Sequence, residues 1–310
     1  MDLKQLTALV AIADTGSVTR AAEILHIVQP AVSRQIQLLE QELDCSLFER
    51  SRQGMRLTAD GRKLVERARR VLAELERARI EIRPATEQLT GTVTVGLLAS
   101  TAELLADELV RDVRGRHPGI TLRITAGYAG DLREWLEDGD VDMALLYGLK
   151  PSAAMQVTPL IDESLWVVAP VEDGLDPDLA VSFAEVARHP LVMPGAAHGL
   201  RALVERAAAA HQLGLSVVTE TNAVAVQKRL AQAALAWTIL PAVAVTDDVA
   251  RGALSAAPIA DPELSRRIVL ALPRTPRPTE AVRVVAERLV EVMSAAVTGG
   301  VWPSARWLPH

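Results

Sequence analysis

Hydrophobic residues recur at helical spacing over the first 43 residues and predict three helices. The first runs from Leu3 and stops near Gly16, the second follows a cap at Ser17 and reaches Leu25, and the third covers residues 29–43. Gln29 and Pro30 mark the start of the third, because proline is tolerated in the first turn of a helix. Its apolar positions lie four, three and four residues apart and predict one buried stripe, formed by Val32, Ile36, Leu39 and Leu43. The short turn before it is typical of a helix–turn–helix, whose second helix enters the DNA major groove.

The next segment predicts a small β-wing and then one long helix. Residues 47–61, "LFERSRQGMRLTADG", combine apolar anchors with a turn at Gly54 and three arginines. From Thr58 to Arg83 the apolar residues alternate spacings of four and three, which gives a narrow seam formed by Leu64, Ala68, Val71, Leu75, Ala78 and Ile82. A helix of about 26 residues is a rod of roughly 39 Å. We expect a dimerisation helix, the alternative being a helix packed on its own effector domain.

From residue 91 the hydrophobic period alternates between strand and helix. The predicted strands are residues 92–98, 120–126, 141–147, 165–170, 190–195, 215–221, 237–241 and 267–273. The predicted helices are residues 101–114, 131–138, 199–212, a segment from Asn222, and 280–296. This alternation predicts parallel α/β layers, and its repetition indicates two α/β lobes. We expect a hinge at 84–91 and a loosely held tail at 297–310.

Composition narrows the class of protein. A chain of 310 residues suggests two or three domains, and 49% hydrophobic with 23% charged residues is ordinary globular composition. The sequence does not open with a basic segment followed by an apolar run, so we expect no secretory signal. No apolar stretch reaches the roughly 18 residues that a membrane span requires, so we expect no membrane span. The single cysteine, Cys45, excludes an intramolecular disulfide and favours a reducing cytoplasm. The six histidines show no metal-ligand spacing.

The net charge of −6 is unevenly distributed. Residues 1–90 hold 14 basic and 13 acidic residues, whereas the remainder holds 19 and 26, so the two parts carry +1 and −7. Over residues 50–70 only Asp60 and Glu66 oppose eight basic residues: Arg50, Arg52, Arg56, Arg62, Lys63, Arg67, Arg69 and Arg70. A basic segment on an acidic protein indicates contact with a polyanion, the alternative being an ordinary solvated face.

The polar face of the 29–43 helix is free of acids until Glu40. Solvated helix faces usually mix glutamate and lysine, whereas this one carries Gln29, Ser33, Arg34 and Gln37. Arg34 is the strongest candidate for base recognition, because a guanidinium can grip guanine O6 and N7, or a phosphate, through two hydrogen bonds. The alternative for each residue is a merely solvated side chain.

No catalytic motif is recognisable after residue 91, so we expect no enzyme, no cofactor and no metal. Polar residues do stand where strands give way to helices: Ser100 with Thr101, His198 with Gly199, and Asn222. Helix N-termini present unpaired N–H groups, so several facing one cleft would hold a small anion or carboxylate. Capping is the alternative role for each residue alone.

The first 62 residues resemble the winged helix–turn–helix of LysR-type transcriptional regulators. The resemblance rests on "GSVTRAAEILHIVQPAVSRQIQLLEQEL" and "LFERSRQGMRLTADG". Val28 departs from it, because the family often has a small hydroxyl residue there, and Asp44-Cys45 replace a glycine and an aliphatic residue. The resemblance and the polar face together give the expected DNA-binding residues: Ser17, Gln29, Pro30, Ser33, Arg34, Gln37, Arg52 and Arg56.

The remainder is similar to the effector domain of the same regulators, especially the nitrogen-assimilation-control branch. Segments such as "HPGITLRITAGYAGDLREWLEDGDVDMALLYG" carry this likeness. It implies two Rossmann-like lobes similar to periplasmic solute-binding proteins, the first from residues 91–163 and 265–310 and the second from residues 164–264. The cleft between them would be lined by Ser100, Thr101, Tyr128, Tyr147, His198 and Asn222.

Together these features predict a cytoplasmic, sequence-specific transcriptional regulator that binds double-stranded promoter or operator DNA. We expect a DNA-binding domain over residues 1–60 and a coiled-coil linker helix with hinge over residues 58–88. Expected partners are RNA polymerase, a small-molecule effector and further copies of the chain, in a homodimer or homotetramer, with no membrane contact. The alternative is a cytoplasmic small-molecule-binding protein whose N-terminal domain serves assembly only.

Overall fold

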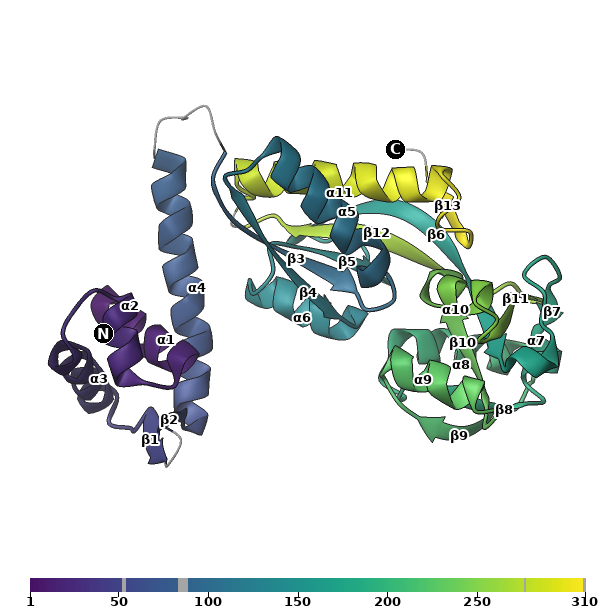
Figure 1. The fold of residues 1–310 in the computed structure, drawn as a ribbon, viewed down its shortest axis with the longest axis horizontal. Helices are drawn as coiled ribbons and strands as arrows, with labels where there is room; N and C mark the ends of the chain where they lie inside the picture. The colour runs from purple at the N-terminus through teal and green to yellow at the C-terminus, as the bar shows by residue number, and fades with distance from the viewer. Residues whose placement is uncertain (52–53, 83–88, 276, 309–310) are drawn as a thin grey trace. The chain divides into compact units, whose positions relative to one another are not determined.

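The computed structural model describes residues 1–51, 54–82, 89–275 and 277–308. The chain divides into two compact units, residues 1–86 and residues 87–310. The first unit is helical with a small hairpin, whereas the second alternates strands and helices (Figure 1). This confirms the predicted order of a helical winged part followed by an α/β part.

The elements of the N-terminal unit follow the predicted pattern. They are α1 (Leu3–Thr15), α2 (Val18–Ile24), α3 (Gln29–Leu43), the antiparallel strands β1 (Phe48–Ser51) and β2 (Gly54–Leu57), and α4 (Ala59–Ile82). Asp2 starts α1 with a reciprocal cap: its carboxylate accepts from Gln5 N at 2.9 Å while Gln5 Oε1 accepts from Asp2 N at 2.7 Å. The predicted helices and wing are therefore present.

The buried stripe of α3 is one residue shorter than its pattern predicts. Val32, Ile36 and Leu39 are buried, but Leu43 is 39% exposed. Leu43 is the last residue of α3, and Asp44 follows in the left-handed conformation (φ 50°), which ends the helix there. Leu43 therefore lies beyond the core of this unit.

The first half of α4 packs on its own unit, which corrects the predicted seam. Val65 and Ala68 are 3% and 1% exposed, and Leu64 and Leu72 pack against the same core. Ala68 is therefore covered within the chain. Exposed residues of the seam are Val71, Leu75 and Ala78, and the side chain of Ile82 lies outside the described residues.

Two glycines allow close backbone contacts that fix the wing and the start of α4. A Cβ on Gly54 (φ +120°) would lie 2.5 Å from Gly16 O, which accepts from Met55 N at 2.9 Å. A Cβ on Gly61 would lie 2.0 Å from Leu47 O. Only glycine fits either place.

The second unit is built on one mixed sheet with the strand order β4-β3-β5-β12-β6-β10-β8-β9. Its strands on this path are β3 (Gly91–Leu98), β4 (Ile120–Gly127), β5 (Met143–Tyr147), β6 (Met155–Ala169), β8 (Pro190–Met193), β9 (Ser216–Glu220), β10 (Trp237–Pro241) and β12 (Ser265–Pro273). Off this path lie β7 (Val181–Ser182), β11 (Ser255–Ala260) and β13 (Ala305–Trp307). Its α-helices are α5 (Ala102–Arg116), α6 (Ala129–Asp138), α7 (Phe183–Val186), α8 (Gly199–Ala210), α9 (Val224–Gln232), α10 (Thr246–Ala250) and α11 (Glu280–Thr298).

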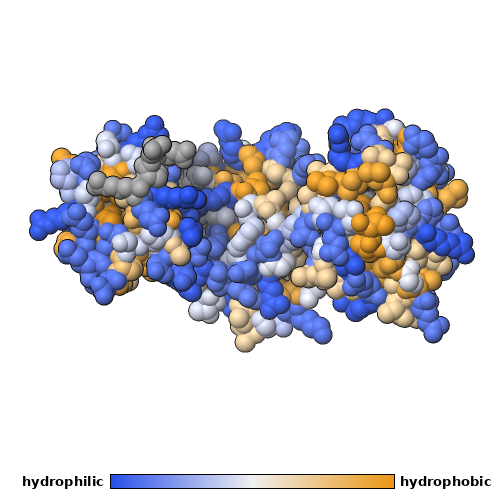
Figure 2. Space-filling model, turned by 90° about the horizontal axis from the view of Figure 1, so that it is seen from below, coloured by the Kyte–Doolittle hydropathy of each residue, from blue (hydrophilic) through white to orange (hydrophobic). Residues whose placement is uncertain are grey.

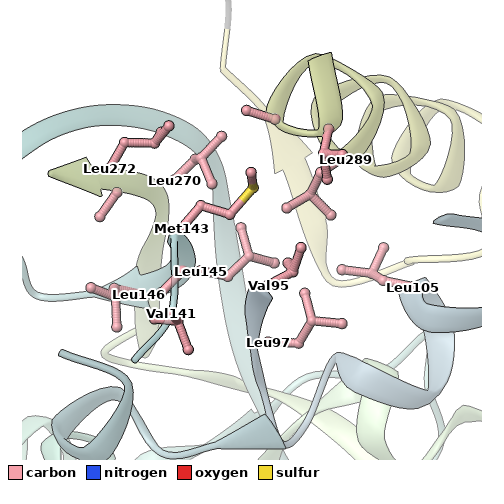
Figure 3. Packing of buried hydrophobic residues seen from close by; sticks show 14 of the residues in the cluster. Val95, Leu97, Leu105, Val141, Met143, Leu145, Leu146, Leu270, Leu272 and Leu289 are labelled. Carbon is pink, nitrogen blue, oxygen red and sulfur yellow. The ribbon is translucent and has the colours of Figure 1, made fainter. Parts of the chain in front are cut away.

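Two large separate cores divide this unit into lobes. The core of lobe 1 draws on residues 93–161 and 268–302, and includes leucines and valines from β3, β5, β12, α5 and α11 (Figure 3). The core of lobe 2 draws on residues 165–264. Each lobe thus buries its own apolar residues.

The strands that pass from lobe to lobe are antiparallel, which corrects the prediction of purely parallel layers. β6 pairs antiparallel with β12 in lobe 1 and with β10 and β11 in lobe 2. The first ten residues of β6 were missed because their sequence carries Pro159, Asp162 and Glu163 instead of an apolar run. Glu163 is nevertheless fully buried, a feature that hydrophobic periodicity does not detect.

The C-terminal tail is held firmly, so the expectation of a loose segment at 297–310 is wrong for the residues described. Trp302 and Ser304 are 1% and 6% exposed, and β13 pairs with β6. Ser304 O accepts from Ser164 N at 2.8 Å. A glycine- and proline-containing sequence suggested mobility, but the large indole of Trp302 anchors it in the core of lobe 1.

Candidate nucleic-acid interface and ligand cavity

A groove of about 760 Å³ crosses the N-terminal unit between α2, α3 and the wing. Its walls include the start of α2, the polar side of α3 and the start of β2. It brings together four of the predicted DNA-binding residues: Ser17, Gln29, Ser33 and Gln37. The sequence missed Thr19 and Arg20 in the first turn of α2, which line the same groove. Their place directly after the capping Ser17 was the available signal.

Side chains in the groove form local hydrogen bonds. Gln29 Nε2 donates to Ser33 Oγ at 3.0 Å, so two residues one turn apart on α3 support each other. Ser17 Oγ accepts from Arg20 N at 3.4 Å and caps α2. Local bonds of this kind can be exchanged for bonds to a ligand that enters the groove.

The remaining predicted residues lie outside the groove lining. Pro30, Arg34 and Arg56 are exposed, and Arg52 lies outside the described residues. Arg34 forms no hydrogen bond or ion pair with any described residue. Its guanidinium is therefore uncommitted on the exposed face of α3.

Glu40 is the first acid on this face of α3, and its carboxylate accepts hydrogen bonds from the backbone of its own unit. Its Oε1 accepts from Leu47 N at 2.7 Å and from Phe48 N at 3.3 Å. These bonds join the end of α3 to the start of β1. The polar face before Glu40 is thus left without an acid.

The second unit contains a cavity of about 30 Å³ where both lobes contribute residues. Four helix N-termini meet there: Ser100 precedes α5, Tyr128 is the N-cap of α6, His198 is the N-cap of α8, and Val224 begins α9. The positive ends of helix dipoles therefore converge on one small space, which is favourable for a negative charge.

Four of the six predicted cleft residues line this cavity, namely Ser100, Tyr128, Tyr147 and His198. The other two have local structural roles. Thr101 is fully buried and its Oγ1 donates to Leu98 O at 3.0 Å. Asn222 Oδ1 accepts from Gly195 N at 2.9 Å.

Arg266 is the cavity residue that the sequence did not reveal. It is 6% exposed, its Nε donates to Glu163 Oε2 at 2.7 Å, and an outer guanidinium nitrogen donates to Ser100 Oγ at 2.8 Å. Its Cζ lies 4.9 Å from the centre of the Tyr147 ring. Glu163 Oε1 also accepts from Trp302 Nε1 at 2.7 Å. This buried network ties the C-terminal tail to the cavity.

His198 is a neutral hydrogen-bonding group at the cavity. Its Nδ1 accepts from Leu200 N at 3.2 Å, which places the proton on Nε2. Nε2 is buried and has no hydrogen-bond partner among the described residues. Burial, and then the charge of Arg266, lower the pKa of His198 below its usual value. Burial also raises the pKa of Tyr147, so this phenol stays protonated.

The described residues contain neither a candidate membrane span nor a candidate metal site. None of the helices there is long and apolar enough to cross a membrane. Nor do histidine, cysteine, aspartate and glutamate side chains gather there in a group that could hold a metal ion.

Family profiles match most of the chain. Residues 3–62 match the profile described as "Bacterial regulatory helix-turn-helix protein, lysR family", and residues 86–294 match "LysR substrate binding domain".

Two curated relatives are regulators of nitrogen assimilation. The nitrogen assimilation regulatory protein nac of Klebsiella aerogenes is 31% identical over 242 residues, 78% of each chain. Its Escherichia coli (strain K12) counterpart is 29% identical over 300 residues, 96% of this chain and 97% of the relative.

Solved structures share the fold. A full-length OxyR variant from Pseudomonas aeruginosa matches with a TM-score of 0.68 and 24% identity, covering 94% of this chain and 97% of that one. Full-length CbnR complexed with its target DNA also matches with a TM-score of 0.68, at 21% identity, covering 96% of this chain and 100% of that one.

Proposed function

The chain belongs to the LysR family of DNA-binding transcriptional regulators, in the branch similar to the nac proteins, and we propose which of its residues contact DNA and effector. It is a regulator with an effector-binding domain and not an enzyme. The observation that carries the residue assignment is the exposed, acid-free face of α3 with the uncommitted guanidinium of Arg34.

In this proposal α3 enters the major groove of the duplex, and the residues that line the groove of the N-terminal unit face the DNA. Gln29, Ser33 and Gln37 contact base edges, and Arg34 grips a guanine or a phosphate. Contacts to the sugar–phosphate backbone come from Ser17, Pro30 and the wing residue Arg56, together with Arg52 outside the described residues. Support comes from the groove itself, since it places three polar residues of α3 beside the capped start of α2.

The proposed effector is a small anion or carboxylate bound in the cavity of the second unit. Four converging helix N-termini, the guanidinium of Arg266 and the free Nε2 of His198 support this choice. A cavity of about 30 Å³ holds little more than one water molecule, so a larger carboxylate requires the lobes to separate. Binding then shifts the balance between two lobe arrangements, provided that the ligand prefers one of them.

We further propose that α4 pairs with α4 of a second copy and that effector units complete a tetramer in the cytoplasm. Val71 and Leu75 are 45% and 37% exposed on α4, which supports burial against a partner. Figure 2 shows hydrophobic residues gathered over lobe 2 on the face in view. Exposed aliphatic residues of lobe 2 include Val218 and Val226. We also propose that the protein contacts RNA polymerase at promoters.

Selection of genomic fragments by the purified full-length protein tests these assignments. We expect a defined set of duplexes to be enriched, with log K falling steeply as log salt rises because several phosphates are neutralised. Footprints of the enriched fragments, repeated with a panel of inorganic anions and small carboxylates, should change with at least one of them. No enrichment at low salt would instead favour an assembly role for the N-terminal unit, whereas footprints unchanged by every anion would overturn the effector assignment alone.

A further inference from the structure

Val28 is the most exposed of the large hydrophobic side chains in the described part of the chain, at 70%. It is the N-cap of α3, directly before Gln29. A large aliphatic side chain in water gains nothing from the hydrophobic effect. Its methyl groups are therefore free to contact a partner outside the unit.

The start of the helix gives no reason for an aliphatic side chain at this position. Valine is among the least favourable N-cap residues, and Val28 makes no side-chain bond to the first turn of α3. Pro30 has no backbone N–H, and Ala31 N already donates to Val28 O at 2.9 Å, so the missing cap is tolerated. A serine or threonine would fit the same backbone (φ −78°, ψ 143°) and be better solvated. Valine is thus tolerated here, but the fold does not require it.

The position of Val28 connects it to the proposed DNA interface. Gln29, its neighbour in the chain, lines the groove together with Ser33. The backbone bond from Ala31 holds Val28 in the first turn of α3. A duplex that approaches Gln29 and Ser33 therefore also approaches the exposed methyl groups of Val28.

We propose that Val28 is a specificity-determining residue that contacts the 5-methyl group of a thymine in the operator. Among the base edges of the major groove, only thymine offers a methyl group, and apolar side chains recognise it by contact. The expected thymine lies beside the base that Gln29 contacts. This inference rests on the proposed DNA interface and adds to it a preference at one base pair.

Replacement of thymine by uracil tests the contact, because it removes the methyl group and leaves the hydrogen-bonding edge intact. Each thymine of a selected operator is replaced in turn, and affinity for the full-length protein is measured. Wild-type protein should bind about fourfold more weakly at one thymine per half-site, which is what the burial of one methyl group is worth. Val28→Ser and Val28→Ala should bind the thymine and uracil duplexes equally.

A matched control is Ile24→Ser, because Ile24 is 61% exposed at the end of α2 and does not adjoin Gln29 in the chain. It should keep the wild-type uracil penalty. Val28→Ala separates the contact from capping, since alanine neither caps α3 nor reaches the thymine.

An unchanged uracil penalty in both Val28 variants, or none in the wild type, would overturn the assignment of Val28 while the DNA interface stands. Failure of the wild-type protein to bind any duplex would overturn both.

Discussion

Arg34 and Arg266 are two arginines in opposite environments, one in each unit of the chain. Arg34 is exposed on α3 and has no partner among the described residues. Arg266 is 6% exposed and hydrogen-bonded to both Glu163 and Ser100. The first guanidinium is available to a partner that arrives from outside, whereas the second already belongs to the structure around the cavity.

The environment of each arginine therefore determines whether its replacement changes the stability of the protein or its function. An exposed, unpaired arginine can be removed with little effect on folding. A buried one, and the acid that pairs with it, cannot be removed without leaving a charge unpaired. Variants of the two sites should therefore affect different measurements.

The largest expected effect is that of Glu163→Gln on the stability of the effector unit. Loss of the carboxylate leaves the Arg266 guanidinium buried without a counter-charge, and should lower the free energy of unfolding by about 3–5 kcal/mol. All five tryptophans lie beyond residue 86, so denaturant titration followed by tryptophan fluorescence reports on this unit alone. Arg34→Ala lies in the other unit and should leave this transition unchanged. Equal midpoints for wild type and Glu163→Gln would contradict the role of the buried pair.

The next effect concerns the wing. Arg56→Ala should weaken binding to all operators to a similar extent and reduce the slope of log K against log salt by about one, because one phosphate contact is lost. Salt titrations on several operators measure both quantities. If the variant changed the preference between operators instead, Arg56 would contact a base and not the backbone.

The third effect is a pH dependence of anion binding at the cavity. The pKa of His198 is lowered in the free protein, first by burial and then by Arg266, so the imidazole is neutral at pH 7. A bound anion favours its charged form and raises that pKa, so binding takes up a proton. Affinity should rise as the pH falls through the pKa of the bound state, by at most tenfold per unit, and should level off below the lowered pKa of the free protein. Titrations between pH 5.5 and 8 measure it, and His198→Gln should abolish the dependence.

The smallest effect is that of Asp162→Asn, a control one residue from Glu163. Asp162 pairs with the exposed Arg267 at 2.7 Å, so its replacement should cost less than about 1 kcal/mol. The hydrogen bond from Arg267 lowers the pKa of Asp162. The stabilisation is therefore complete above pH 3.8 and is lost as the pH falls through the lowered pKa. In acid denaturation the variant should lack this pH-dependent stabilisation. A loss of unfolding free energy as large as that of Glu163→Gln would contradict the distinction between the exposed and the buried ion pair.

The N-terminal unit could be predicted from sequence because its signals are local. The spacing of Val32, Ile36 and Leu39 gives the buried side of α3, and the residues between them give its polar side. Two errors arose at its edges. Leu43 lies beyond the core, and Ala68 is buried within its own unit. The second error arose because a heptad pattern does not show whether its apolar residues pack within the chain or against a second copy.

The effector cavity was only partly predictable, because its decisive pairings are distant in sequence. Ser100, Tyr128 and His198 stand at strand–helix junctions and could be found. Arg266 faces Glu163 across β12 and β6, and the sequence pattern of neither strand marks a buried ion pair. Trp302 joins them from a tail that looked mobile.

The most direct test of the account is a base-by-base comparison of wild type and Arg34→Ala on one selected operator. Each base pair is substituted in turn, and affinity is measured at fixed salt. We predict a loss of about 1–3 kcal/mol for Arg34→Ala and a flattened preference at one base pair per half-site, with all other positions unchanged. An affinity and a preference profile identical to those of the wild type would show that the exposed face of α3 does not recognise DNA in the proposed way.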